Sequence, residues 1–254
     1  MGTLGGFPNP PATGSGERSS ATPTRSGVPR LYLITDRQAT AGRPLLTVIG
    51  QALKGLAGSG LDPGEVAVQL REKDLGGRAL VALARPLREL TAAAGVRLFV
   101  NDRIDVALAV GADGVHLGGT SLSPAEARAL APTLAVAVST HGMADVRAAA
   151  GQAAFAVFGP IRDTPSKRGY GPPLGPGPLA EAAPLGLPLL ALGGIDVSDV
   201  AAVVAAGARG VACVRPVMAA ADPAAAVRAL AEALDEALGE GLGEGLGEGL
   251  DQAR

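Results

Sequence analysis

The chain has 254 residues, of which 47% are hydrophobic and 18% are charged, and its formal net charge is -2 at pH 7. A chain with so little net charge, 2% aromatic residues and no Trp lacks the positive field and the stacking surface that nucleic-acid-binding proteins use. The single cysteine, Cys213, excludes an internal disulfide framework, and its apolar neighbours predict a buried thiol.

Residues 1–29 are rich in Gly, Pro, Ser, Thr and Arg and cannot bury enough apolar surface to offset their ordering entropy. We predict a disordered tail there. The Arg and Ser content is also found in transit peptides, but no amphipathic pattern accompanies it. No apolar run approaches the ~20 residues of a membrane span, and no apolar segment precedes a secretory cleavage site. We therefore expect a cytoplasmic protein.

Between residues 30 and 238, short apolar runs alternate with Ala- and Leu-rich segments of helical character. Near-continuous apolar strands separated by helices indicate a parallel sheet. The predicted strands are LYLIT from Leu31, VAVQL from Val66, RLFVN from Arg97, GVHLG from Gly114, AVAVS from Ala135, FAVFG from Phe155, PLLALGG from Pro188 and GVACV from Gly210. The clearest predicted helices cover residues 45–56, 78–94, 197–206 and 223–238.

Eight such units in one stretch favour a closed (β/α)8 barrel, the TIM barrel, over an open doubly wound sheet. An open sheet is expected to carry a Gly-rich turn after its first strand, whereas TDR follows the first strand here. We predict one α/β barrel domain over residues 30–238. The sequence GEGL then repeats, and its glycines each weaken a helix by about 1 kcal/mol relative to Ala. Residues 239–254 are therefore predicted to be a low-complexity tail.

Polar residues follow the predicted strands, where a barrel of this kind carries its chemistry. Any one of them could be a solvated loop residue, but their joint placement on one rim indicates a binding or active site. They are Gln69, Arg71, Glu72 and Lys73, then Asn101 and Asp102, His116, Ser139 and His141, Thr164, Ser166 and Lys167, Gly193 and Gly194, and Arg215.

Gln69, Arg71 and Lys73 alternate along the chain and therefore share one side of the extended backbone. Three hydrogen-bond donors, two of them cationic, suit an anionic ligand such as phosphate. The alternative is a salt-bridge cluster in which Glu72 and Asp74 neutralise the cations.

A second anion site is predicted after the seventh and eighth strands, where barrels often bind phosphate at a helix N-terminus. Gly193 and Gly194 permit close backbone approach, and a helix follows that Asp196 or Ser198 would cap. Arg215 at the end of the eighth strand would strengthen this site.

Asp102 is a single carboxylate at a strand end, and Mg²⁺ often takes one or two carboxylates and completes its shell with water and substrate phosphates. The alternative is that Asp102 caps the helix that begins near Ile104. His116 and His141 do not have the spacing of a zinc site. His141 could transfer a proton, whereas His116 is expected to be packed and hydrogen-bonded at the barrel mouth.

Several segments, in this order and spacing, resemble thiamine phosphate synthase from Leu31 to Met218: LYLITDR, QLREK, NDRIDVALAVGADGVHLG, VST followed by His, FGPIRDTPSKRGYGPPLG, ALGGI and AGARGVACV. The resemblance implies a transferase of thiamine biosynthesis. It would join hydroxymethylpyrimidine pyrophosphate to thiazole phosphate and release pyrophosphate, through a pyrimidine cation that the thiazole nitrogen attacks. It also implies Mg²⁺ as cofactor and phosphorylated small molecules as partners, with no nucleic acid and no membrane. A homo-oligomer is possible, and the sequence does not decide the oligomeric state.

The resemblance also implies residue roles, all of them concerned with phosphate charge. The residues that would hold the pyrophosphate are Gln69, Arg71, Lys73, Asn101, Ser139 and Lys167, and Asp102 would ligate the metal. Those near the thiazole phosphate would be Thr164, Ser166, Gly194, Val214 and Arg215. The catalytic set would be Lys167, Ser139, Arg71 and His141.

The sequence departs from the family pattern at two places. The family usually reads GQ-x-D after the fourth strand, with that Asp as a second metal ligand, whereas Gly119 and Ser121 stand here. Arg215 stands where the family commonly has Ser. The missing Asp favours a sister group, the thiazole tautomerases, for which His141 would be the proton-transfer residue. The complete TPSK segment favours the synthase, and a non-catalytic sensor of phosphorylated ligands is a third reading.

Overall fold

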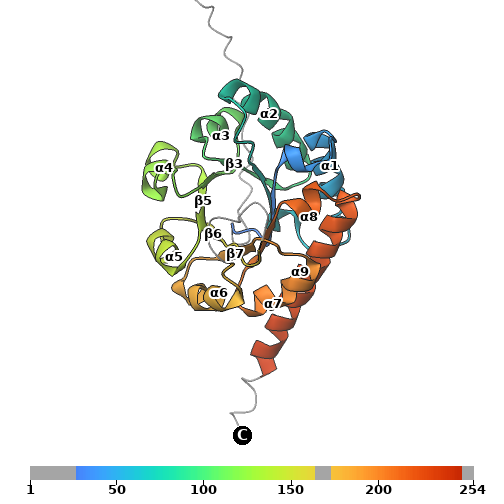
Figure 1. Ribbon diagram of the computed structural model, residues 1–254, viewed down its shortest axis with the longest axis vertical. Coiled ribbons are helices and arrows are strands. Elements are labelled where there is room, and N and C mark those ends of the chain that lie inside the picture. The colour runs from blue at the N-terminus through green and yellow to red at the C-terminus, as the bar shows by residue number, and fades with distance from the viewer. Residues whose placement is uncertain (1–26, 164–172, 248–254) are drawn as a thin grey trace, which may run out of the picture.

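The computed structural model describes residues 27–163 and 173–247 of the chain. Within them, eight parallel strands close into a barrel in sequence order, and β8 returns to pair with β1. Figure 1 looks into this barrel and shows the helices as a ring around it, with α9 lying across one side. The structure therefore confirms the predicted (β/α)8 architecture.

Each predicted apolar run forms one strand of the barrel. The strands are β1 (Leu31–Ile34), β2 (Val66–Leu70), β3 (Arg97–Asn101), β4 (Gly114–Leu117), β5 (Ala135–Thr140), β6 (Phe155–Phe158), β7 (Leu189–Leu192) and β8 (Gly210–Cys213). Their residues are almost all buried because the helices cover one face and the barrel interior the other.

The connections between strands carry the helices. The α-helices are α1 (Leu45–Lys54), α2 (Gly77–Ala93), α3 (Ile104–Val110), α4 (Pro124–Leu130), α5 (Met143–Ala149), α6 (Pro176–Ala182), α7 (Val200–Ala205), α8 (Arg215–Met218) and α9 (Pro223–Gly247). The short 3-10 helices are η1 (Arg37–Ala39), η2 (Pro63–Glu65), η4 (Ala183–Leu185) and η5 (Val197–Asp199). None of the described helices has a stretch long and apolar enough to cross a membrane.

Two of the predicted helices differ from the observed ones. The segment predicted over residues 197–206 is split into η5 and α7, with Asp196 as the N-cap of η5. Helix α9 runs on to Gly247, beyond residue 238 and into the GEGL repeat. Extending an existing helix does not require the unfavourable nucleation step. Each added residue therefore contributes only the free energy of helix propagation, even where Gly is frequent.

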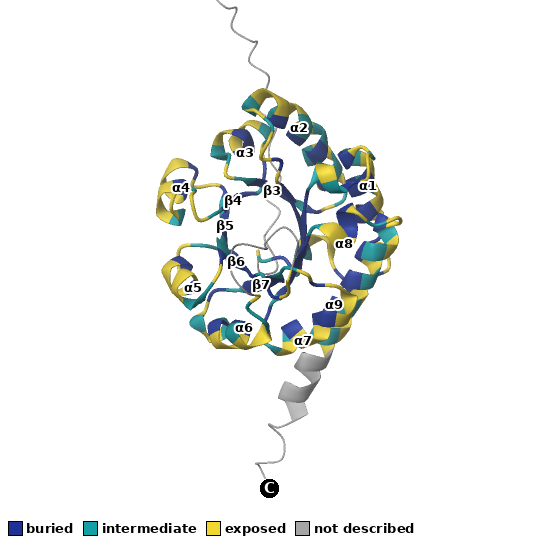
Figure 2. Cartoon of the chain, in the orientation of Figure 1, coloured by how far each residue is buried: buried dark blue, intermediate teal, exposed yellow. Residues whose placement is uncertain are grey.

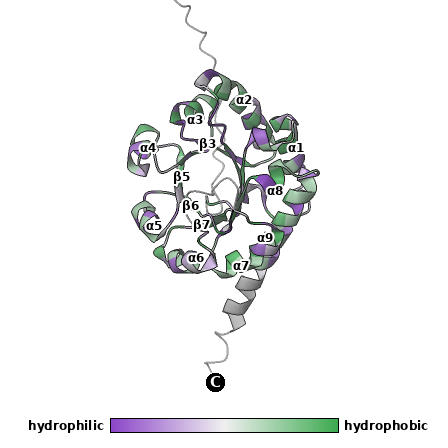
Figure 3. Ribbon diagram, in the orientation of Figure 1, coloured by the Kyte–Doolittle hydropathy of each residue, from purple (hydrophilic) through white to green (hydrophobic). Residues whose placement is uncertain are grey.

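The apolar side chains form two separate layers. The larger one fills the space between strands and helices and is built mainly from Leu, Val and Ala. The smaller one fills the barrel interior, where the ring of Tyr32 meets those of Phe99 and Phe155 edge to face at centroid distances of 5.7 and 5.4 Å. Figure 2 shows buried strands at the centre and exposure on the outer helix faces, and Figure 3 shows the polar residues concentrated on those outer faces.

Cys213 lies in β8 with its side chain buried. Burial raises the pKa of its thiol to about 12, because a thiolate would lose its hydration there. The thiol is therefore protonated and inert near neutral pH, as its apolar neighbours predict.

Gly210→Ala is expected to destabilise the barrel at the closure between β8 and β1. A Cβ atom at Gly210 would lie 1.9 Å from the backbone oxygen of Arg30, so one of the two strands would have to move. Overpacking of this kind costs about 1–3 kcal/mol or more. Gly119→Ala is the matched control, because a Cβ there meets no atom within 4 Å. Urea unfolding of both variants measures the difference, and equal midpoints would contradict the packing at this closure.

Candidate active site

The carboxyl ends of all eight strands meet at one mouth of the barrel because the strands are parallel. The sequence-predicted site residues that the structure describes are all in or just after these strand ends. From β2 to β8 they are Gln69, Arg71, Lys73, Asn101, Asp102, Ser139, His141, Gly194, Val214 and Arg215. Thr164, Ser166 and Lys167 lie outside the described residues.

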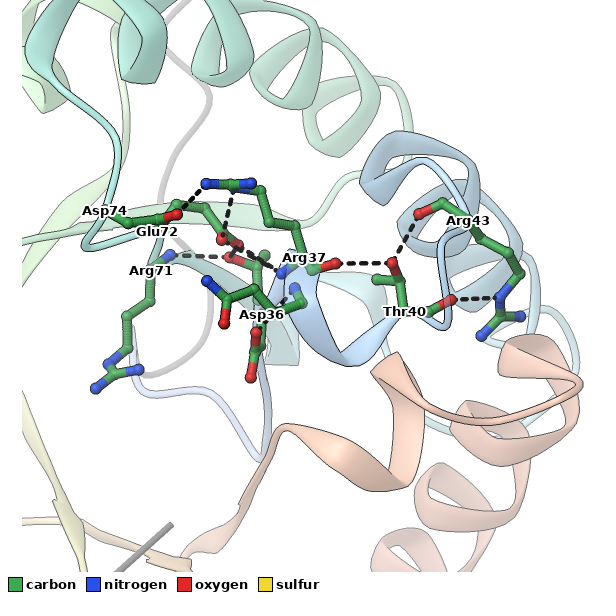
Figure 4. A network of polar contacts seen from close by, with 9 residues as sticks. Asp36, Arg37, Thr40, Arg43, Arg71, Glu72 and Asp74 are labelled. Atoms are coloured by element: carbon green, nitrogen blue, oxygen red, sulfur yellow. Dashed lines mark hydrogen bonds and ion pairs between the residues drawn. The ribbon is translucent and has the colours of Figure 1, made fainter.

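A polar cluster around Arg37 joins the turn after β1 to the turn after β2 (Figure 4). The Arg37 guanidinium forms an ion pair with Asp74 and lies 3.5 Å from a carboxylate oxygen of Glu72. The backbone N–H of Arg37 donates to both Glu72 oxygens at 3.2 and 3.3 Å, and the Thr35 hydroxyl donates to Glu72 at 2.7 Å. Burial raises the pKa of Glu72, while the bonds from Thr35 and Arg37 act in the opposite direction.

This cluster bears on the alternative in which Glu72 and Asp74 neutralise Arg71 and Lys73. Arg37 takes both neighbouring carboxylates, so Arg71 and Lys73 are exposed and have no acidic partner among the described residues. The backbone N–H of Arg71 donates to the Thr35 hydroxyl at 2.9 Å, and Figure 4 shows its side chain directed away from Glu72 and Asp74. Exposed cations without an acidic partner in the described part of the chain can attract an anion.

Asp102 lies at the end of β3 in the left-handed region, with φ of 60°. Its carboxylate accepts hydrogen bonds from the Asn101 side-chain amide at 2.9 Å and from the Ser121 hydroxyl. The Gly118 backbone N–H in turn donates to the Ser121 oxygen at 2.6 Å. Helix α3 begins after Arg103 and has no side-chain cap, so Asp102 is not the capping residue of the alternative reading.

Gln69 does not lie with Arg71 and Lys73, although the sequence predicts that the three residues share one side of the backbone. Its side chain is buried in the barrel interior, whereas Arg71 and Lys73 are exposed beyond the end of β2. The Gln69 amide nitrogen donates to the Tyr32 hydroxyl at 3.2 Å. The strand ends at Leu70, so the alternation that put the three residues on one side does not continue through Arg71.

His116 is buried in β4, as the sequence predicts, and both ring nitrogens have partners. Nδ1 lies 3.3 Å from the Tyr32 hydroxyl, and Nε2 lies 2.9 Å from the Ser139 hydroxyl. Burial lowers the pKa of His116 to about 3, with a smaller opposing effect of Asp102. Burial also raises the pKa of Tyr32. Near neutral pH the ring is therefore a neutral imidazole and the phenol keeps its proton.

His116 should make folding stability depend on pH. Between its ordinary pKa of 6.5 and its folded pKa of about 3, the unfolded chain binds a proton that the folded protein does not. The contribution of His116 to stability is therefore fully present above its unfolded-state pKa. It declines as the pH falls from that pKa towards the folded-state pKa. Relative to His116→Gln, the wild type should lose up to about 1.4 kcal/mol of unfolding free energy for each pH unit in this window.

Urea titrations at about pH 7, about pH 5.5 and about pH 4.5 measure this loss. His141→Gln changes the other histidine of the chain and should retain the wild-type decline. Parallel pH curves for the wild type and His116→Gln would show that His116 does not carry the effect.

His141 follows β5 and is exposed. Its Nδ1 lies 2.6 Å from the Gly159 carbonyl oxygen, and its backbone N–H donates to Asp145 at 2.8 Å. A carbonyl oxygen only accepts, so Nδ1 carries the proton and Nε2 is the nitrogen with no partner among the described residues. This placement is compatible with the proton-transfer role expected from the sequence.

The backbone of the loop after β7 favours glycine at both predicted positions. Gly193 and Gly194 have φ of 104° and 67°, and a Cβ at Gly193 would lie 2.7 Å from the Cα of Pro160. Asp196, not Ser198, caps η5 by accepting from the Ser198 backbone N–H at 2.9 Å.

At the end of β8, Val214 precedes the short helix α8, whose first residue is Arg215. Arg215 is exposed and has no ion-pair partner among the described residues. The last two strands thus bring a glycine turn and a free cation to the same mouth as Arg71 and Lys73.

Comparisons with known proteins identify the family of the chain. The sequence pattern of the thiamine monophosphate synthase family matches residues 31–217. The thiamine-phosphate synthase of Roseiflexus castenholzii is 46% identical over 213 residues, covering 82% of this chain and 89% of the relative. That of Xanthobacter autotrophicus is 43% identical over 203 residues, covering 79% and 92%.

A solved structure leads to the same family. The thiamine phosphate pyrophosphorylase from Pyrococcus furiosus superimposes with a TM-score of 0.73 at 30% identity, over 82% of this chain and 96% of that one. The residues matched by the family pattern, 31–217, span all eight strands of the barrel. The chain therefore belongs to the thiamine monophosphate synthase family.

Proposed function

We propose that this transferase joins hydroxymethylpyrimidine pyrophosphate to thiazole phosphate and produces thiamine phosphate and pyrophosphate. The observation that carries the proposal is that Arg71 and Lys73, which follow β2 at the mouth, have no ion-pair partner in residues 27–163 and 173–247, while Arg37 pairs with the nearby acids. A leaving pyrophosphate gains negative charge as its bond breaks, and fixed cations at its position stabilise that charge.

The bond changes balance without any proton transfer. The carbon–oxygen bond of the pyrimidine methylene breaks first, and its electron pair leaves with the pyrophosphate oxygen. The thiazole nitrogen then donates its lone pair to the methylene cation, which forms the new carbon–nitrogen bond. Arg71, Lys73, Asn101, Ser139 and Lys167 would bind the pyrophosphate, so their work is electrostatic and positional.

The second phosphate would lie on the other side of the mouth. The residues proposed to bind it are Thr164, Ser166, Gly194, Val214 and Arg215. The left-handed turn at Gly193 and Gly194 would let the backbone approach that phosphate without a side chain in the way. Arg215 adds a cation where the family commonly has Ser.

The donors around Asp102 fit Mg²⁺. The carboxylate is exposed and accepts hydrogen bonds from Asn101 and Ser121, and the Ser121 hydroxyl would be available as a further oxygen ligand. No group of three or more His, Cys, Asp and Glu side chains among the described residues could hold a metal on its own. Mg²⁺ suits such a sparse set because it retains water and binds phosphate oxygens. When bound, it would neutralise part of the pyrophosphate charge.

The experiment that tests the proposal runs two reactions on the full-length protein. One contains hydroxymethylpyrimidine pyrophosphate, thiazole phosphate and Mg²⁺, and the product is thiamine phosphate. The other contains the thiazole phosphate carboxylate alone and detects its isomerisation. Isomerisation without thiamine phosphate formation would identify the protein as a thiazole tautomerase. Ser121 in place of the usual Asp favours this alternative. Binding of either substrate without turnover would identify the protein as a non-catalytic sensor of phosphorylated ligands.

A further inference from the structure

A continuous hydrogen-bond chain crosses the barrel interior beneath the mouth. The Gln69 amide nitrogen lies 3.2 Å from the Tyr32 hydroxyl, which lies 3.3 Å from His116 Nδ1. His116 Nε2 lies 2.9 Å from the Ser139 hydroxyl. Gln69, Tyr32 and His116 are buried, whereas Ser139 at the end of β5 is half-buried at the mouth. The chain therefore connects the interior to one group that a ligand can reach.

The direction of this chain follows from the proton inventory of its members. An amide nitrogen only donates, so the Tyr32 oxygen accepts from Gln69. The buried Tyr32 hydroxyl has one other partner among the described residues, His116 Nδ1, so it donates its single proton there and Nδ1 is unprotonated. A neutral ring with a bare Nδ1 carries its proton on Nε2 and donates it to the Ser139 oxygen. The hydroxyl proton of Ser139 therefore takes no part in this hydrogen-bond chain.

We propose that Tyr32 and His116 are positioning residues that force the Ser139 hydroxyl to act as a donor towards an anionic ligand in the mouth. The proposal rests on the proposed function, in which that anion is the pyrophosphate group of the substrate. Ser139 has no other hydrogen-bond partner among the described residues, so its proton is free for the ligand.

The opposite direction would have the opposite effect. If Nδ1 carried the histidine proton, Nε2 would accept the Ser139 proton and the serine would present only lone pairs to the mouth. Lone pairs repel a phosphate oxygen, whereas a hydroxyl proton forms a charge-assisted hydrogen bond with it. The tautomer of one buried imidazole thus decides whether Ser139 attracts or repels the anion.

The first experiment reads the tautomer directly by nitrogen NMR of the ¹⁵N-histidine-labelled full chain without ligand. The protein has two histidines, and each should give a different pattern. We expect His116 to be protonated at Nε2 and bare at Nδ1. His141, whose Nδ1 faces the Gly159 carbonyl, serves as the internal reference with a protonated Nδ1. A proton on Nδ1 of His116 would overturn the proposal, and this measurement requires no variant.

The second experiment is a double-mutant cycle read by binding of inorganic pyrophosphate with Mg²⁺. Ser139→Ala should weaken binding about 10-fold or more, since it removes a hydrogen bond to a charged group. Tyr32→Phe retains the ring packing but removes the donor to Nδ1, and it should weaken binding about 3- to 10-fold. In the Ser139→Ala background, Tyr32→Phe should change binding less than about twofold, because both act on one contact.

Thr140→Val is the matched control for loss of a hydroxyl. Thr140 follows Ser139 in β5, but it is buried and its hydroxyl donates to the Val157 carbonyl oxygen at 3.3 Å. This variant should leave pyrophosphate affinity and the His116 tautomer unchanged. Additive effects of Tyr32→Phe and Ser139→Ala would overturn the positioning role. A failure of the proposed function would show instead as absent thiamine phosphate formation with the expected tautomer still in place.

Discussion

Lys167→Ala is expected to lower turnover about 100-fold or more without unfolding the protein. Lys167 lies outside the described residues, but in the proposed reaction its ammonium would contact the departing pyrophosphate and gain interaction energy as the bond breaks. The loss of one such contact typically costs about 2.7–4 kcal/mol in the transition state. The effect should appear mainly in kcat, because the charge that Lys167 meets is larger in the transition state than in the bound substrate.

Steady-state kinetics of the variant, with a thermal unfolding scan of the same preparation, measure this effect. Lys54→Ala is the matched control, since Lys54 is an exposed residue in the last turn of α1, on the outer ring of helices. Control and wild type should have the same turnover. Wild-type turnover by Lys167→Ala would remove Lys167 from the active site.

Asp102→Ala should reduce the rate at limiting Mg²⁺ by about 100-fold, because a metal at a phosphoryl oxygen contributes several kcal/mol of charge stabilisation. Asp102 is the carboxylate at this position, and Ser121 stands where the family usually has the second one. Ser121→Asp should change the enzyme in the opposite direction and lower the Mg²⁺ concentration for half-maximal rate. Two carboxylates bind the cation more tightly than one carboxylate and a hydroxyl.

A Mg²⁺ titration of thiamine phosphate formation tests both substitutions. Ser121→Ala is the matched control, because it removes the bond to Asp102 without adding a charge. It should not lower the Mg²⁺ requirement. If Asp102→Ala and Ser121→Asp both gave the wild-type titration curve, the metal would not be held at Asp102.

The sequence is sufficient for most of the fold because the barrel strands are buried on both faces. Such strands are continuous apolar runs, so the predicted strands of GVHLG and GVACV are present as β4 and β8. The ends of helices are less determined. Helix α9 continues through glycines that disfavour it, and the segment after β7 opens as a 3-10 turn because Asp196 caps it locally. These outcomes depend on contacts that a propensity pattern does not contain.

The strand-end positions of the candidate site residues can be predicted from the sequence, whereas the contacts between distant segments cannot. Arg71 and Lys73 follow from their position at a strand end. Nothing in the spacing indicates that Arg37 would neutralise Glu72 and Asp74 from the turn after β1. The bond from Gln69 to Tyr32 likewise joins two adjacent strands whose register the sequence does not state. The motif LYLITDR contains both Tyr32 and Arg37, but neither residue was distinguished from its neighbours.

The measurement that tests the proposed function most directly is the product ratio of the full-length enzyme supplied with both phosphorylated substrates and Mg²⁺. Mass spectrometry quantifies thiamine phosphate, and a coupled assay quantifies pyrophosphate. The proposed function predicts one pyrophosphate for each thiamine phosphate and neither product when thiazole phosphate is omitted or Mg²⁺ is chelated. Isomerised thiazole carboxylate without thiamine phosphate at any Mg²⁺ concentration would contradict it.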